Sequence, residues 1–142
     1  MKNRMTVAFV LFLILAVGAW VGFNPPGRFG LCRFGLTVYS GIPFPVVDLV
    51  VRADGRPAIR ASKAHWVSEE EVDRLIGTQP EAWPEVLIIG TGYEGMVQVD
   101  PALLTRCKGP PIEILRTPEA LRRYNELRAA GRRVAAIIHS TC

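Results

Sequence analysis

The chain has 142 residues, of which 49% are apolar and 21% charged, with a formal net charge of +4 and a mean hydropathy of +0.22. This composition excludes a disordered tail or a low-complexity linker, because such segments are poor in apolar residues. Three cysteines, an odd number, argue against a small domain stapled by disulfides. The length is enough for one ordinary domain.

The N-terminal segment, residues 1–23, predicts a single transmembrane anchor. Met5 to Phe23 is an apolar run without an ionisable side chain, and as a helix it would measure about 28 Å, close to the thickness of a hydrocarbon core. Trp20 near its end suits the membrane interface, and Asn24 opens a Pro- and Gly-rich break. We therefore expect a single-pass membrane protein that contacts the bilayer through residues 5–23.

A cleaved signal peptide is the alternative, because Lys2 and Arg4 form a basic leader and Val17-Gly18-Ala19 offers small residues for a peptidase. A buried core helix would need a polar face, which the run lacks. The side of the membrane stays open, since the basic N-terminus competes with Arg28 and Arg33 beyond the span. Three cysteines without an evident pairing suit a reducing compartment better than an oxidising one outside the cytoplasm.

The remaining residues predict one compact domain with a single core. Residues 24–33 have the proline and glycine content of a linker, and residues 34–142 form the body. Its front half is rich in β-branched and apolar residues, and Asp54-Gly55 predicts a hairpin turn. Ser68 then begins a capping box, so we expect a short helix that ends at Gly77.

The back half alternates strands with helices. Thr117 is predicted to cap the longer helix, which ends at Gly131. The expected elements are a strand over Val86 to Ile89, a second strand over Met96 to Val99, a helix from Asp100-Pro101 to near Gly109, a strand over Ile112 to Leu115, the longer helix, and a strand over Val134 to Ile138. Such alternation predicts an α/β fold with a mixed, mostly parallel sheet and additional N-terminal β structure.

The order of several motifs resembles the domain-of-unknown-function 498 family, whose fold is called Mth 938-like. The motifs that carry the resemblance are Pro84-Glu85-Val86-Leu87-Ile88-Ile89-Gly90-Thr91-Gly92, Thr117-Pro118-Glu119-Ala120, Tyr124-Asn125-Glu126-Leu127 and Arg132-Arg133-Val134-Ala135-Ala136-Ile137-Ile138-His139 with Cys142. The resemblance implies a three-layer α/β domain with helices on one side of the sheet and extra β structure on the other. Members include a mitochondrial assembly factor for respiratory NADH dehydrogenase. The family offers no catalytic residues to carry over, and its members typically lack a membrane anchor.

The stretch Gly90 to Gly95 spells GxGxxG directly after a predicted strand. A dinucleotide site would need a helix to begin at the third glycine, whereas the next predicted helix begins only at Asp100. A tight turn after a buried strand is the favoured interpretation.

Parallel strands should bring their carboxyl ends together at one edge of the sheet, where ligands of α/β proteins usually bind. We therefore predict a candidate pocket at this edge, formed by Gly90, Thr91, Gly92, Arg116, Thr117 and His139.

No metal site or cofactor is predicted from residue spacing. His139 and Cys142 lie three positions apart, so on an extended chain their side chains would point to opposite faces. The three cysteines lack CxxC spacing, and His65 has no partner at a metal-ligand spacing. His139 is expected to be a hydrogen-bonded residue at a strand end, and His65 a surface residue.

Charge is distributed in blocks: residues 24–67 hold six basic and two acidic side chains, residues 68–95 one and seven, and residues 96–142 eight and four. A basic surface beside an anchor suits anionic lipid or an acidic partner. Basic and aromatic residues do not interleave as in nucleic-acid readers, so no nucleic-acid partner is expected.

The favoured hypothesis is a membrane-anchored, non-enzymatic interaction domain that binds an unknown protein and assists assembly or stabilisation of a membrane complex. The alternative is a small-molecule-binding protein or an enzyme that uses the strand-end edge.

Overall fold

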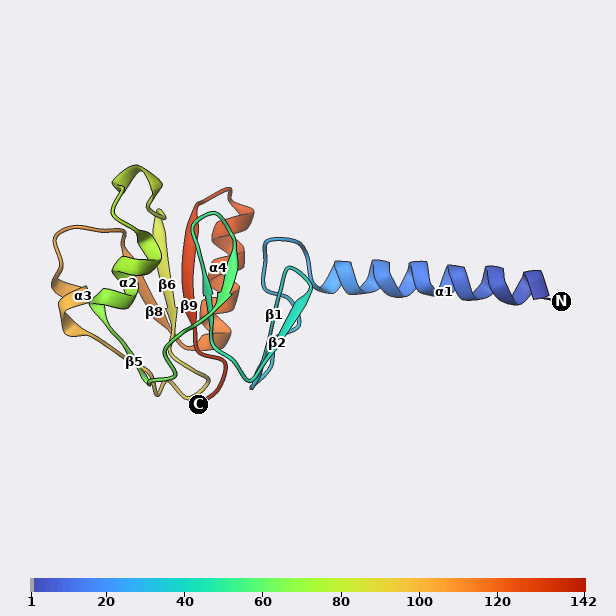
Figure 1. The fold of residues 1–142 in the computed structure, drawn as a ribbon, viewed down its shortest axis with the longest axis horizontal. Helices are drawn as coiled ribbons and strands as arrows, with labels where there is room; N and C mark the ends of the chain where they lie inside the picture. Colours follow the sequence, from blue (N-terminus) through green and yellow to red (C-terminus); the bar gives the residue numbers. More distant parts are fainter. Residues whose placement is uncertain (1) are drawn as a thin grey trace.

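The computed structural model describes residues 2–142 and consists of a layered α/β body from which one long helix projects (Figure 1). Helix α1, Lys2–Phe23, is exposed at every position from Asn3 to Phe23. Among the described residues, one helix is long and apolar enough to cross a membrane, and it begins at Asn3. A signal sequence would pass the same test of length and composition.

The body is built on a five-stranded mixed sheet whose strand order is β4-β3-β9-β6-β8. Strands β6, β8 and β9 are parallel, and β3 runs against β9 and β4. Val86 pairs with Val134 in parallel register, so the expected direction of the later strands is confirmed. The strands are β3 (Leu49–Val51), β4 (Pro57–Ile59), β6 (Val86–Gly90), β8 (Ile112–Leu115) and β9 (Val134–Ile138).

Helices cover both faces of this sheet, so the expectation of helices on one side only is wrong (Figure 1). Helix α4, Thr117–Ala129, packs on one face, while α2, Glu69–Ile76, and α3, Pro101–Thr105, pack on the other. The physical reason lies in β6 and β9, which are buried at every position and therefore need an apolar layer on each side.

The predicted start and end of α2 are confirmed, whereas α3 is shorter than predicted. The Ser68 hydroxyl accepts a hydrogen bond from the Glu71 amide at 3.2 Å, and Gly77 ends α2 as predicted. Helix α3 ends at Thr105 instead of near Gly109. Leu103 is its one buried residue, so no apolar stripe continues the helix.

Two short strands, which directly precede α2 and α3 in the chain, form a separate parallel pair. Strand β5, Trp66–Val67, pairs with β7, Gln98–Val99, so the strand expected over Met96 to Val99 is shorter and lies outside the central sheet. A single 3-10 turn, η1, spans Pro80–Ala82 before β6.

The N-terminal β structure serves two purposes. The pair β3 and β4, joined through the predicted turn at Asp54-Gly55, completes the central sheet. Strands β1, Leu36–Tyr39, and β2, Ile42–Pro45, form a separate hairpin on the face that carries α4 (Figure 1). Its two-residue turn has positive φ at both Ser40 and Gly41, as right-twisted hairpins favour.

The segment predicted as a linker, residues 24–33, is packed against the body. Phe29 is buried, and its ring meets those of Tyr39 and Tyr124 edge-on at centroid distances of 5.0 and 4.9 Å. The Asn125 side chain accepts from the Phe29 amide at 2.9 Å and donates to the Phe29 carbonyl at 2.7 Å. The segment is therefore held to α4 by both packing and hydrogen bonds.

The end of α1 is tied to the hairpin by side-chain hydrogen bonds. The Trp20 indole donates to the Gly41 carbonyl at 3.1 Å. Asn24 is buried, donates through its amide to the Trp20 carbonyl at 3.0 Å and accepts from the Leu31 amide at 2.9 Å. A side chain at Gly30 would collide with Asn24, which fixes the path of the chain here. The helix therefore meets the body through a joint formed by Trp20, Asn24 and the β1–β2 turn.

Replacing Asn125 with alanine should lower the free energy of unfolding by about 1–3 kcal/mol, because both backbone polar groups of Phe29 lose their partner. The measurement is urea unfolding of the full chain in detergent, followed by circular dichroism. Arg122→Ala, on the exposed face of the same helix, is the control and should leave the midpoint nearly unchanged. Equal stability of the two variants would contradict the role given to Asn125.

Candidate functional site

The carboxyl ends of β6, β8 and β9 meet at one edge of the sheet, and the predicted residues gather there. The His139 amide donates to the Gly90 carbonyl at 3.1 Å, and the Thr91 amide donates to the Leu115 carbonyl at 2.9 Å. Thr91 and His139 are both buried, whereas Arg116 is exposed. The predicted residues therefore come together, and what they form depends on their hydrogen bonds.

Thr117 joins the ends of two strands and does not cap α4. Its hydroxyl donates to the His139 carbonyl at 2.7 Å and accepts from the Gly92 amide at 3.0 Å, and the side chain is buried. The residue at the cap position is Arg116, whose side chain makes no capping hydrogen bond. The capping role predicted for Thr117 is wrong because two buried backbone groups need a partner at this position.

The glycines of the GxGxxG stretch allow a close backbone turn. Gly92 has a φ of +98°, and a Cβ there would collide with the Cys142 carbonyl. At Gly90 a Cβ would lie 3.1 Å from the Thr117 hydroxyl. The next helix along the chain begins only at Pro101, so the stretch does not itself open a helix as a dinucleotide-binding motif does. The start of α4 lies beside it instead, and the Thr117 amide donates to the Gly92 carbonyl at 3.0 Å. The tight-turn interpretation fits this geometry.

One of the six predicted residues, His139, lines a cavity at this edge. His139 lines a cavity of about 200 Å³ together with Asp48 and Arg60. The polar groups of Gly90, Gly92 and Thr117 at the edge are hydrogen-bonded to the protein itself. These hydrogen bonds interlock the strand ends, and a ligand pocket formed by the six residues stays a prediction.

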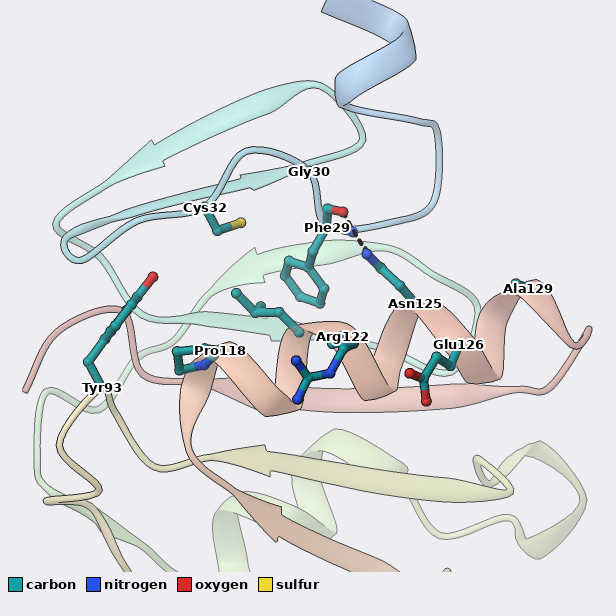
Figure 2. Close-up of a pocket in the computed structure, with 10 residues that line it drawn as sticks. Phe29, Gly30, Cys32, Tyr93, Pro118, Arg122, Asn125, Glu126 and Ala129 are labelled. Atoms are coloured by element: carbon teal, nitrogen blue, oxygen red, sulfur yellow. Dashed lines mark hydrogen bonds between the residues drawn. The ribbon is translucent and has the colours of Figure 1, made fainter.

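A larger cavity, of about 570 Å³, lies beside α4 (Figure 2). We call it the α4 groove. Its walls combine apolar groups from the packed N-terminal segment with charged groups from the helix. It is lined by Phe29, Gly30, Cys32, Tyr93, Pro118, Leu121, Arg122, Asn125, Glu126 and Ala129. Tyr93 and Pro118 are the chain neighbours of Gly92 and Thr117, so the groove begins where the interlocked strand ends finish.

The titratable groups on the apolar side of the α4 groove are held neutral. Burial raises the pKa of the Cys32 thiol above its ordinary value, although hydrogen bonds with the backbone of Val38 and Gly30 act in the opposite direction. Burial likewise raises the pKa of Tyr93. Because the thiolate is the nucleophilic form of cysteine, this environment does not activate Cys32.

Asp48 and Arg60 form a buried polar network that the sequence analysis did not predict. The Arg60 guanidinium donates to both Glu71 carboxylate oxygens, at 2.6 and 2.9 Å, and lies 3.4 Å from Asp48. Burial works against its charge, but the bonded Glu71 carboxylate and Asp48 raise the pKa of Arg60 above its ordinary value. Asp48 also contacts the His139 Nδ1 at 2.6 Å and accepts from the Ser140 amide at 2.9 Å.

The structure brings His65, His139 and Cys142 together, which spacing along the chain did not indicate. Their donor atoms lie within 4.8 Å of one another, and His65 Nε2 is 3.1 Å from the Cys142 Sγ. The chain bends after β9, so the expectation that His139 and Cys142 point to opposite faces is wrong: the Thr141 hydroxyl contacts both the His139 Nε2 and the Cys142 Sγ. His139 does lie hydrogen-bonded at a strand end, as expected.

Replacing Thr117 with valine should lower the free energy of unfolding by about 1–3 kcal/mol, because the buried Gly92 amide and His139 carbonyl lose their shared partner. Thr117→Ser keeps the hydroxyl and should retain most of the stability. Thr105→Val, at an exposed helix position, is the matched control for loss of a threonine hydroxyl. Thermal melting of the three variants is the measurement; equal melting temperatures for Thr117→Val and Thr105→Val would contradict the bridging role.

Comparison with solved structures finds the same fold in several other proteins. MT938 is 39% identical, with a TM-score of 0.66, and the match covers 81% of this chain and 98% of that one. The conserved hypothetical protein PH1505 from Pyrococcus horikoshii OT3 is 29% identical, with a TM-score of 0.68 and coverages of 81% and 99%. An outer membrane protein from Bartonella henselae also shares the fold. It is 18% identical, with a TM-score of 0.65, and the match covers 84% of this chain and 99% of that one.

The family model described as "Protein of unknown function (DUF498/DUF598)" matches residues 35–139, which span the body from β1 to the end of β9. Helix α1 and the joint at Asn24 lie outside the matched range. The resemblance seen in the sequence motifs is therefore confirmed, and the chain belongs to the DUF498/DUF598 family.

Proposed function

We propose that this protein is a membrane-anchored binding domain that holds a partner protein beside the bilayer and thereby assists assembly or stabilisation of a membrane complex. The observation that carries the proposal is the joint between α1 and the body. The Trp20 indole and the Asn24 amide connect the helix end to the β1–β2 turn and to Leu31. A signal peptidase acting after Ala19 would sever the helix directly before Trp20, inside the continuous helix.

The surface of α1 supports the anchoring part of the proposal. Its apolar side chains stay uncovered along the whole length, with Leu11 at 55% and Leu15 at 72% exposure. A continuous apolar surface of this kind is costly in water and is stable in a hydrocarbon core. The Trp20 indole bonds to Gly41, next to the exposed Ile42. With α1 in the bilayer, both residues would lie at the membrane interface, where an indole is favoured.

The position of the α4 groove supports the binding part. Phe29, which lines the groove, follows the last residue of α1 by only six positions, so in this proposal the groove lies near the membrane. Arg122 and Glu126 stand on its helix side, and the ring of Phe29 and the Cys32 thiol stand on the other (Figure 2). Such a surface suits a segment of a membrane protein that carries an apolar side chain between charged ones.

The strand-end edge supports the alternative, a small-molecule site, less well. The Thr117 hydroxyl and the Gly92 amide satisfy each other, whereas a ligand pocket presents convergent polar groups to its ligand. Thermal-shift screening with nucleotides and common metabolites tests this alternative.

The full chain should remain in the membrane pellet after alkaline carbonate extraction and should keep its N-terminal peptide by mass spectrometry. The double variant Leu11→Arg/Leu15→Arg should move to the supernatant, because each arginine at the centre of a span costs about 2.5–3.5 kcal/mol. Ile59→Arg/Met96→Arg adds the same charge at exposed sites of the body and should stay in the pellet. A soluble wild-type chain, or one that begins after Ala19, would contradict the proposal.

A photo-crosslinking residue at position 122 should form an adduct with an integral membrane protein in native membranes. The same residue at position 74 is the matched control, since Arg74 is exposed on α2 at the opposite face of the sheet. The charge reversal Glu126→Lys should reduce the adduct at position 122 by removing one polar wall of the groove. Identical adduct patterns at both positions, or none at either, would argue against a partner in the α4 groove.

A further inference from the structure

We propose that His65, His139 and Cys142 form a binding site for a Zn²⁺-type ion. The site is separate from the membrane anchor and the α4 groove, so it does not depend on the function proposed above. Two imidazoles and one thiolate are the nitrogen and sulfur donors that Zn²⁺ prefers, whereas Mg²⁺ and Ca²⁺ favour oxygen ligands.

The distances between the donor atoms suit one shared ion. Around tetrahedral Zn²⁺, imidazole nitrogens and a thiolate sulfur stand about 3.3–3.7 Å from one another. The His65 Nε2 and the Cys142 Sγ are already 3.1 Å apart, and all three donors lie within 4.8 Å. The two imidazole rings lie edge to face, with their centroids 4.9 Å apart. Closing a separation of 4.8 Å to this spacing needs a combined side-chain shift of about 1–1.5 Å.

Asp48 supplies the orienting contact that metal-binding histidines usually have. Its carboxylate lies 2.6 Å from the His139 Nδ1, which directs the other ring nitrogen, Nε2, toward the ion. A carboxylate on the far nitrogen fixes the tautomer and raises the basicity of the ligand. Asp48 is itself held by the Ser140 amide and by Arg60, so the imidazole of His139 is positioned by a buried network.

Backbone hydrogen bonds hold the other two ligands in place. The His65 carbonyl accepts from the Gln98 amide at 3.0 Å, directly before the β5–β7 pair. The carbonyl of Thr141, next to Cys142, accepts from the Tyr93 amide at 3.2 Å. His65 is exposed, so an ion can reach the site from solvent.

Three protein ligands leave one position of a tetrahedral ion open. Structural zinc sites are closed by four protein ligands, whereas sites that bind water or another molecule at the metal keep an open position. The proposed site therefore carries a water when nothing else is bound. It also connects residue 65 with residue 142 across the ends of the central strands.

The test uses the untagged full chain in detergent with a non-thiol reductant, titrated with Co²⁺ alone and then with Zn²⁺ alone. We expect one Co²⁺ per chain, with visible bands and a sulfur-to-cobalt charge-transfer band, and displacement of Co²⁺ by Zn²⁺. His65→Ala should weaken binding roughly 100-fold or more, as loss of a ligand costs at least what loss of its orienting partner does. Cys142→Ser should abolish the charge-transfer band.

Cys107→Ser is the matched control, because Cys107 is an exposed cysteine outside the cluster, and its spectrum should equal that of the wild type. His65 is exposed, so its removal should leave the body folded, and circular dichroism of the variant tests this independently. Failure of the wild type to bind either metal at micromolar concentration would overturn the proposal. Binding that survives in both His65→Ala and Cys142→Ser would place the ion elsewhere and would also overturn it.

Discussion

Burial of β6 and β9 on both faces is the constraint on which the rest of the structure depends. Every residue of Val86–Gly90 and Val134–Ile138 is buried, so each face of this strand pair requires an apolar layer. Helix α4, with the packed segment around Phe29, covers one face, and α2 with α3 covers the other. Because the two strands are parallel, their carboxyl ends lie side by side, and the loops that leave them must share one edge.

The shared edge explains why so many polar residues converge there. The turn at Gly92, the start of α4 at Thr117 and the bend after β9 meet within hydrogen-bond distance. The same bend carries Cys142 to His65. The joint between α1 and the body lies on the α4 side of the sheet. It is formed by Trp20, Asn24 and the turn of the β1–β2 hairpin.

Local patterns predict the elements well and their tertiary contacts poorly. The buried runs at Val86 and Val134, the turn at Asp54-Gly55 and the Ser68 cap are each encoded within a few residues, and all are found. Thr117 also fits a local capping pattern, but its hydroxyl is used by two strand ends that the pattern cannot see. The packing of residues 24–33 likewise depends on Asn125, almost a hundred positions away.

The candidate metal ligands show the same limit. His65 and Cys142 are 77 positions apart, so spacing along the chain carries no sign of them, and only the parallel pair β5–β7 and the bend after β9 bring them together. The Asp48–Arg60 network cannot be predicted from the sequence either, because an isolated aspartate or arginine is usually a surface residue. Long-range contacts of this kind are visible only in the folded chain.

The central claim is that α1 lies in the bilayer and holds the body at the membrane surface through the joint at Trp20. Its most direct test is quenching by brominated lipids of a fluorescent amino acid placed at Ile42, compared with one placed at Arg74, in vesicles that contain the full chain. The account predicts strong quenching at Ile42, which lies beside the joint, and none at Arg74 on α2. Absence of quenching at both positions would show that the hairpin does not rest at the bilayer and would contradict the account.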